Sequence, residues 1–105
     1  MMHPIHGTWK ILARGPVGEL PSVNEITVEG DTFSGVMADE KSGKDFPIFN
    51  GKIDGNHVTF EATMKMGFVS MTFQLEGDVS EDGQTVAGTF KALKMQGTFT
   101  GEKLS

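Results

Sequence analysis

Apolar and polar residues alternate along most of this chain, and the alternation is clearest between residues 57 and 79. From Val58 to Met66 the apolar residues occupy every second position, and the same pattern resumes from Val69 to Val79. A period of two is typical of strands that bury one face and expose the other. The interruption at Gly67 predicts that these two strands form a hairpin.

The same alternation marks six more segments, and none of the chain shows a convincing helical period. Turn-forming residues separate the segments, including a breaker-rich stretch at 15–21 and a polar loop at 39–45. The eight predicted strands cover residues 6–15, 22–29, 32–38, 46–54, 57–66, 69–79, 85–92 and 95–101.

Consecutive strands joined by short turns predict an antiparallel meander. An open sheet of eight strands would leave two unpaired edges and one bare apolar face, whereas closure removes both problems. We therefore predict an all-β fold, an eight-stranded antiparallel up-and-down β-barrel. A flattened barrel or two-sheet sandwich is the structural alternative. The prediction treats 1–105 as one domain, with residues 1–5 as a flexible N-terminus. Glycines at inward positions would relieve crowding inside the barrel: Gly35, Gly51, Gly88 and Gly97.

Composition narrows the function classes. The chain has 105 residues and no cysteine, which excludes a disulfide framework and a thiolate metal site. No apolar run reaches the length of a membrane span, and the start lacks the apolar stretch of a signal peptide, so a cytoplasmic protein is expected. The net charge of −5 and the scattered basic residues argue against binding to nucleic acid or to a membrane.

The first predicted strand opens with Gly7-Thr8-Trp9. This resembles the Gly-x-Trp signature of the calycins, which include lipocalins, fatty-acid-binding proteins and avidins. The segments 33–37 and 50–54 are similar in rhythm to avidin strands. The resemblance implies a barrel that Trp9 plugs at one end and that holds a small molecule at the other. The chain is shorter than a lipocalin, lacks the helical lid of fatty-acid-binding proteins and does not match avidin's inward polar cluster, so biotin binding is not expected.

In such a meander the turns near Gly30, Gly55 and Gly83 share one end with the termini, and this end is acidic. The opposite end carries the longer loops and more basic than acidic residues, as expected for a mouth that receives an anionic head group. Its basic residues are Arg14, Lys41, Lys44, Lys65, Lys91 and Lys94.

We therefore predict that the barrel binds a small hydrophobic or amphipathic molecule, which could carry an anionic head group. No cofactor is predicted. Flexible methionines suit an adaptable apolar pocket, although they also serve simply to fill a core. The predicted contacts to the apolar body are Met37, Met64, Met66, Met71, Met95, Phe49 and Phe90. Those to a polar head are Arg14, Asn24 and Lys91.

A cofactor-free enzyme, such as an isomerase, lyase or cyclase, is the first alternative. Polar groups at the mouth would then polarise a carbonyl or enolate. The candidates are Arg14, Ser22, Asn24, Asp39 and Lys91. The alternation directs no general base into the barrel, so no catalytic residue is assigned and catalysis is the less favoured interpretation.

Three histidines, His3, His6 and His57, could meet near Asp54 and bind a divalent metal. Two of them lie on the predicted flexible terminus and the third points outward, whereas metal sites need fixed geometry. No metal site is therefore predicted.

The second alternative is a structural or interaction module with a filled core. Four outward aliphatic residues on the first four strands would form an apolar stripe, which suits a homodimer. They are Leu12, Val23, Val36 and Ile48.

Overall fold

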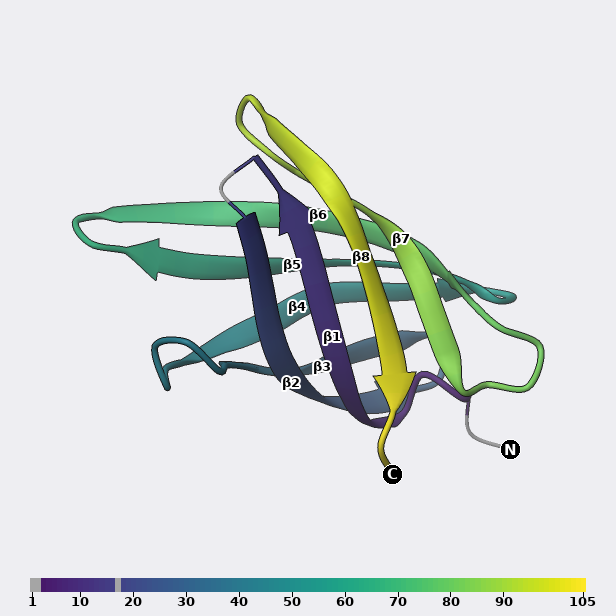
Figure 1. Ribbon diagram of the computed structural model, residues 1–105. Helices are drawn as coiled ribbons and strands as arrows, with labels where there is room; N and C mark the ends of the chain where they lie inside the picture. Colours follow the sequence, from purple (N-terminus) through teal and green to yellow (C-terminus); the bar gives the residue numbers. More distant parts are fainter. Residues whose placement is uncertain (1–2, 17) are drawn as a thin grey trace.

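The computed structural model describes residues 3–16 and 18–105, without the side chain of Met66, and it is built from strands alone (Figure 1). The eight strands are β1 (Gly7–Gly15), β2 (Gly18–Glu29), β3 (Thr32–Asp39), β4 (Asp45–Asp54), β5 (His57–Met66), β6 (Val69–Val79), β7 (Thr85–Ala92) and β8 (Met95–Lys103).

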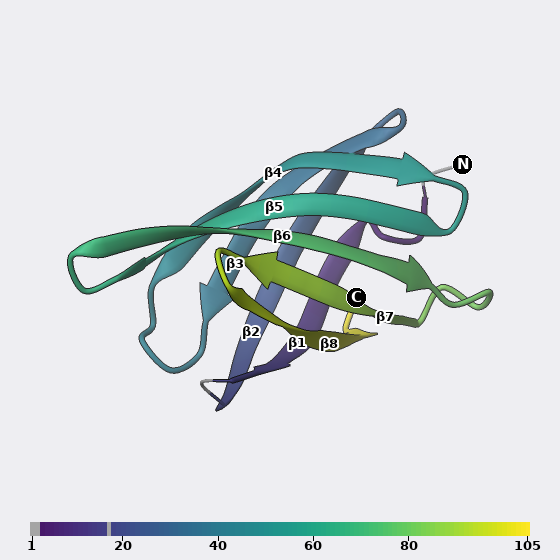
Figure 2. The same cartoon turned by 90° about the horizontal axis from the view of Figure 1, so that it is seen from above.

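Each strand pairs antiparallel with the next one, and β8 pairs with β1, so that the sheet closes into a barrel (Figures 1 and 2). The predicted all-β, eight-stranded up-and-down barrel is confirmed, and the strands form one closed sheet rather than a two-sheet sandwich. Closure gives the backbone groups of every strand a partner on both sides. No helix in the described part of the chain is long and apolar enough to cross a membrane.

Strand β2 begins four residues earlier than the sequence pattern predicts. Gly15 pairs with Gly18, which leaves only a two-residue turn between β1 and β2. Pro21 lies inside the strand opposite Leu12, and its carbonyl accepts a hydrogen bond from the backbone N–H of Glu40 at 3.1 Å. The prediction of a loop at 15–21 is therefore wrong, because a proline can sit in a strand where its carbonyl still pairs.

Strand β4 contains a β-bulge that reverses the facing of its first half. The pairing with β5 shifts between Phe49 and Lys52, and Asn50 adopts a φ of 54°. One extra residue in a strand changes which side chains point inward. Ile48 is therefore buried in the core, although an outward position was predicted, while Gly51 lies inward as predicted.

The N-terminal residues help to close one end of the barrel. Trp9 is fully buried there, and its indole N–H donates a hydrogen bond to the carbonyl of Ile5 at 2.9 Å. Ile5 itself is 2% exposed, and Lys103 donates to the carbonyl of Pro4 at 2.8 Å. Residues 3–5, which fall in the segment expected to be flexible, thus pack over Trp9 as part of the closed end.

The backbone conformation at Gly7, two residues before Trp9, favours glycine. Gly7 adopts a φ of 130°, and a Cβ at this position would collide with the carbonyl oxygen of Ser105. That oxygen accepts a hydrogen bond from the N–H of Thr8 at 3.0 Å. Glycine therefore lets the C-terminus approach β1 at the closed end.

Aromatic side chains fill the half of the barrel next to this closed end. Phe60 makes edge-to-face contacts with Phe33 and Phe99, with ring centroids 5.6 and 6.2 Å apart. All three rings are buried, so the half of the barrel next to the closed end has a packed core. The space inside the barrel that a ligand could fill therefore lies in the opposite half.

Candidate functional site

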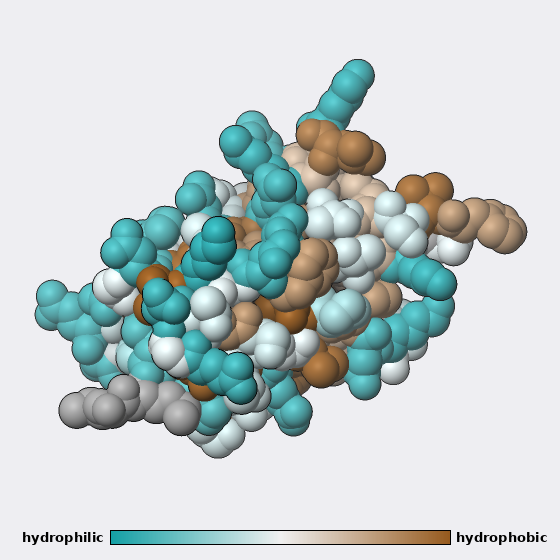
Figure 3. Space-filling view, turned by 180° about the vertical axis from the view of Figure 1, so that it is seen from behind, coloured by the Kyte–Doolittle hydropathy of each residue, from teal (hydrophilic) through white to brown (hydrophobic). Residues whose placement is uncertain are grey.

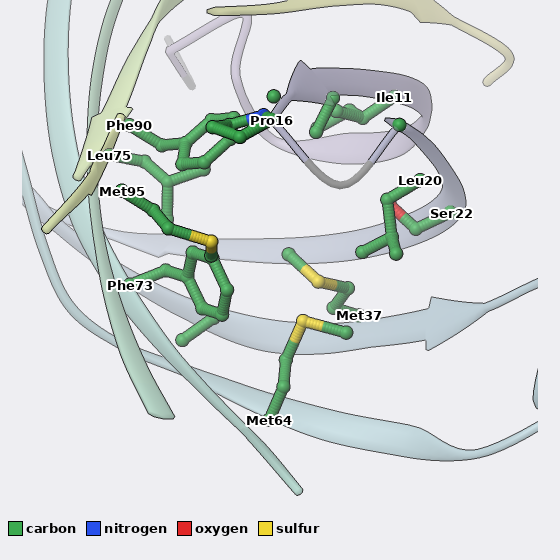
Figure 4. Close-up of a pocket in the computed structure, with 14 residues that line it drawn as sticks. Ile11, Pro16, Leu20, Ser22, Met37, Met64, Phe73, Leu75, Phe90 and Met95 are labelled. Atoms are coloured by element: carbon green, nitrogen blue, oxygen red, sulfur yellow. The ribbon is translucent and has the colours of Figure 1, made fainter. Parts of the chain in front are cut away.

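A cavity of about 60 Å³ lies in the half of the barrel opposite the Trp9 end (Figure 4). Its walls come from β1, the β1–β2 turn, β2, β3, β5, β6, β7 and β8. Figure 4 shows the side chains of Met37, Met64 and Met95 directed toward the same space, beside the rings of Phe73 and Phe90. The site is thus an apolar chamber with several mobile thioethers in its wall.

The Phe90 ring forms one wall of the cavity because two glycines make room for it. A Cβ at Gly97 would lie 2.6 Å from Cζ of Phe90, and one at Gly15 would lie 2.9 Å from the same atom. Phe90 also packs edge-to-face on Phe73, with centroids 5.7 Å apart. Both contacts fix the position of the ring beside the cavity.

One polar side chain faces this apolar space. Ser22, on β2, is the only described lining residue whose side chain carries a polar atom, and it is 2% exposed. Its hydroxyl accepts a hydrogen bond of 2.8 Å from the Nδ2 of Asn24, which is fully buried. The Oδ1 of Asn24 accepts no hydrogen bond from any described residue. The pair therefore offers a serine hydroxyl proton and an unused amide oxygen inside a dry interior.

Some of the predicted apolar contacts line the cavity and others lie elsewhere. Met37, Met64, Met95 and Phe90 line the cavity together, as the alternation led us to expect. Met71 is half-buried on β6 but lies outside the lining, and Phe49 is turned away from the interior by the bulge in β4. The side chain of Met66 lies outside the described part of the structure.

The predicted polar contacts are also divided. Asn24 reaches the interior, whereas the Arg14 side chain is 66% exposed and binds the Glu19 carboxylate at 3.0 Å. Lys91 is exposed and borders a polar groove on the outer wall rather than the cavity. Asp39 is buried, but its carboxylate accepts hydrogen bonds from the loop that follows it. The charged groups at the mouth are therefore engaged elsewhere or directed outward.

Sequence reasoning missed Leu20 and Pro16, which both line the cavity. Leu20 was placed in a loop, although it continues the alternate positions of Ser22 and Asn24 along the same strand. The signal was present in that spacing, but the flanking glycine and proline residues concealed it.

The three histidines contact separate partners. His3 lies 2.7 Å from the carbonyl of Gly55, and His6 accepts a hydrogen bond from the N–H of Val28 at 3.1 Å. Within residues 3–16 and 18–105, no group of three or more histidine, aspartate or glutamate side chains is arranged to hold a metal ion.

The third histidine sits in an acidic surface cluster. The His57 ring lies 3.0 Å from Asp78 and 3.5 Å from Glu76. The hydrogen bond to Asp78, supported by the two negative charges, raises the pKa of His57 above its ordinary value. This cluster is far from the cavity lining and takes no part in the site.

The predicted apolar stripe on the outer wall loses one member. Ile48 is 2% exposed and points into the core, so its assignment to the stripe is wrong. Leu12 and Val23 are half-buried on the outside, and Val36 is 42% exposed. A homodimer through the remaining three residues stays a prediction.

The closed meander and its internal cavity define the molecule as a small up-and-down β-barrel. A comparison with protein-family models gave no match, and a comparison with curated proteins gave none either. The fold is consistent with the calycin resemblance carried by Gly7-Thr8-Trp9, and the functional argument depends on the site itself.

Proposed function

We propose that this protein binds a small, mainly apolar molecule in the cavity at the open half of the barrel. The observation that carries the proposal is an apolar chamber, lined by three methionines and two phenylalanines, with one hydroxyl in its wall. Such a combination of apolar surface with a single orienting polar group is typical of small-molecule sites. We also propose that the barrel is calycin-like, a proposal supported by Gly7-Thr8-Trp9 and by the buried Trp9, which would plug the closed end.

The size of the cavity restricts the ligand. Its volume of about 60 Å³ is several times that of a water molecule site but well below the several hundred Å³ of drug-sized pockets. It is less than half of the roughly 150 Å³ cavity that holds benzene, so a slender chain or a small ring enters only if the cavity widens. Rotation of Met95, which is half-buried at the mouth, would enlarge it, because the unbranched thioether side chain adapts readily.

The interior polar pair favours an uncharged hydroxyl over an anionic head as the group that enters. A ligand hydroxyl would accept a hydrogen bond from the Ser22 hydroxyl. Asn24 lies outside the residues that line the cavity, so donation to its unused oxygen requires the ligand hydroxyl to enter past Ser22. A carboxylate has no proton for that oxygen, and its burial would be costly without a cation. An anionic head would instead stay at the rim, close to Arg14.

The test compares three probes that share a chain and differ in their heads: 1-octanol, octanoate and octylamine. Isothermal titration calorimetry should show saturable binding with 1-octanol as the tightest of the three. Ala13→Leu, which places a larger side chain in the cavity wall, should abolish this binding. Ala87→Leu makes the same change at an exposed position of β7 and should leave it intact.

The alternatives lead to different results. A filled-core module would bind none of the probes, and Ala13→Leu would then behave like Ala87→Leu. Among the described lining residues, none has a titratable side chain. An isomerase, lyase or cyclase would therefore have to recruit its acid or base from outside the lining, and catalysis remains an untested alternative.

A further inference from the structure

We propose that the open end of the barrel docks on an anionic lipid bilayer, with the tips of the β5–β6 and β7–β8 hairpins entering the interface. The docking surface consists of the apolar tip residues Phe68, Val69 and Leu93 together with Lys65, Lys91 and Lys94.

The tips expose large apolar side chains that the fold itself does not need. Phe68 is fully exposed, Leu93 is 90% exposed and Val69 is 57% exposed. Figure 3 shows hydrophobic side chains projecting from two neighbouring points of the surface, with hydrophilic side chains beside them. Exposed apolar groups that project in this way usually mark an interaction surface.

The backbone at one tip adds an independent observation. Leu93 adopts a φ of 53°, a region in which glycine or asparagine is usual and a bulky side chain is strained. Glycine would make the turn at lower cost and would remove an exposed hydrophobic group. The position therefore presents leucine to the outside despite the local cost, as expected if the side chain has a partner.

The charges around the tips identify the partner. The whole chain has a net charge of −5, which led to the expectation of no membrane contact. However, residues 62–75 and 83–101 contain no acidic residue, and their only charged side chains are Lys65, Lys91 and Lys94. Lysines beside inserted apolar groups suit the interface of an anionic membrane, to which each contributes attraction. Most acidic residues lie toward the other end, which would face away, while Glu19, Asp39, Glu40 and Asp45 lie in or beside the β1–β2 and β3–β4 connections of the docking end.

A second copy of the chain fits this surface less well. In a two-fold contact the same patch meets itself, so the three lysines would face three lysines. Contact between the basic tips and the acidic end of another copy is head-to-tail, and it would assemble rings or open chains rather than a two-fold dimer. The bilayer satisfies the apolar and the charged groups together.

Docking would place the cavity mouth against the lipid, since Phe73, Phe90 and Met95 line the cavity on the same two hairpins. An apolar ligand could then pass between bilayer and barrel without crossing water. This last step depends on the proposed function, whereas docking itself does not.

The test is co-sedimentation of the protein with vesicles of phosphatidylcholine, with and without phosphatidylglycerol. Binding should require phosphatidylglycerol and should weaken as salt is added. Replacing both Lys91 and Lys94 by Gln should weaken it by about fivefold for each charge removed. Phe68→Ser combined with Leu93→Ser should reduce it by at least about tenfold. Leu104→Ser, which removes a 57% exposed leucine near the C-terminus, is the matched variant and should bind normally.

Equal binding to both vesicle types, or unchanged binding of the tip variant, would overturn the proposal. A concentration-dependent dimer in light scattering that the tip variant abolishes would assign the surface to a second copy instead. Titration of 1-octanol into the tip variant separates the two proposals, because neither Phe68 nor Leu93 lines the cavity. Normal octanol binding without vesicle binding would contradict docking alone.

Discussion

Replacing Asn24 by leucine tests whether the polar pair beneath the cavity is kept for binding rather than for stability. Asn24 is fully buried, and its amide makes one recorded hydrogen bond, to the hydroxyl of Ser22 at 2.8 Å. The amide oxygen has no donor among the described residues. Such an unpaired buried acceptor costs about 1–3 kcal/mol, while one neutral hydrogen bond contributes only about 0.5–1.5 kcal/mol.

Leucine is close to asparagine in shape and removes both the unpaired oxygen and the hydrogen bond. Asn24→Leu alone also removes the hydrogen-bond partner of the buried Ser22 hydroxyl. We therefore expect the gain from Asn24→Leu combined with Ser22→Ala, which should raise the free energy of unfolding by about 1–2 kcal/mol once repacking is included. For a domain of this size, this corresponds to a rise in Tm of about 5–10 °C. Urea titration followed by the fluorescence of Trp9, the only tryptophan, measures the change. The same variant should bind 1-octanol more weakly, which is the trade-off expected at a binding site.

A double-mutant cycle with Ser22→Ala supplies the control. In the natural background this substitution leaves the Nδ2 of Asn24 without its partner and should destabilise the protein by about 1 kcal/mol. In the Asn24→Leu background it should be stabilising, because it removes the hydroxyl that the first substitution leaves unpaired. If the double variant proves less stable than the natural protein, the oxygen is satisfied in solution and the reasoning about the pair is refuted.

Three further predictions concern the closed end, the cavity wall and the surface histidine. Ile5→Ala should lower the unfolding free energy by about 2–5 kcal/mol and red-shift the emission of Trp9, whereas a loose terminus would give no change. Gly15→Ala should displace the ring of Phe90, the only close neighbour of a Cβ at that position, and cost about 1–3 kcal/mol, and a variant as stable as the natural protein by urea titration would contradict this packing. His57→Gln should reduce the urea midpoint more near pH 5 than near pH 8.5. The raised pKa means that the protonated His57 ring stabilises the folded state. This contribution to the free energy of unfolding is complete below the pKa of the unfolded chain and disappears as the pH rises through the pKa of the folded protein. An equal loss at both pH values would show that the acidic neighbours have no effect on stability.

The barrel could be predicted from sequence because its inward face repeats with a strict period. Met37, Met64 and Phe90 all fall on that face, and all line the cavity. The same rule failed where the period is broken. Ile48 and Phe49 are adjacent apolar residues, and periodicity alone cannot decide which of them points inward when a bulge follows at Asn50.

Other features depended on contacts that the strand period does not encode. Ile5 lies before the first strand, and the hydrogen bond from Trp9 to its carbonyl, four residues back, does not follow from alternation. Arg14 was assigned to a ligand head because of its charge, but the two-residue turn places Glu19 beside it. The pairing of Ser22 with Asn24 could be expected from their spacing, since i and i+2 in a strand share a face. That the Asn24 oxygen lacks a hydrogen-bond donor could not be predicted from the sequence.

The most direct measurement of the central claim is a titration of 1-octanol into protein labelled with ¹³C at the methionine methyl groups. The account predicts saturable shifts of the Met37, Met64 and Met95 methyl signals, with little change at Met71, which lies outside the lining. These shifts should be absent from Ala13→Leu and present in Ala87→Leu. Methyl signals that do not move, or that move equally at Met71, would contradict a ligand site in the open half of the barrel.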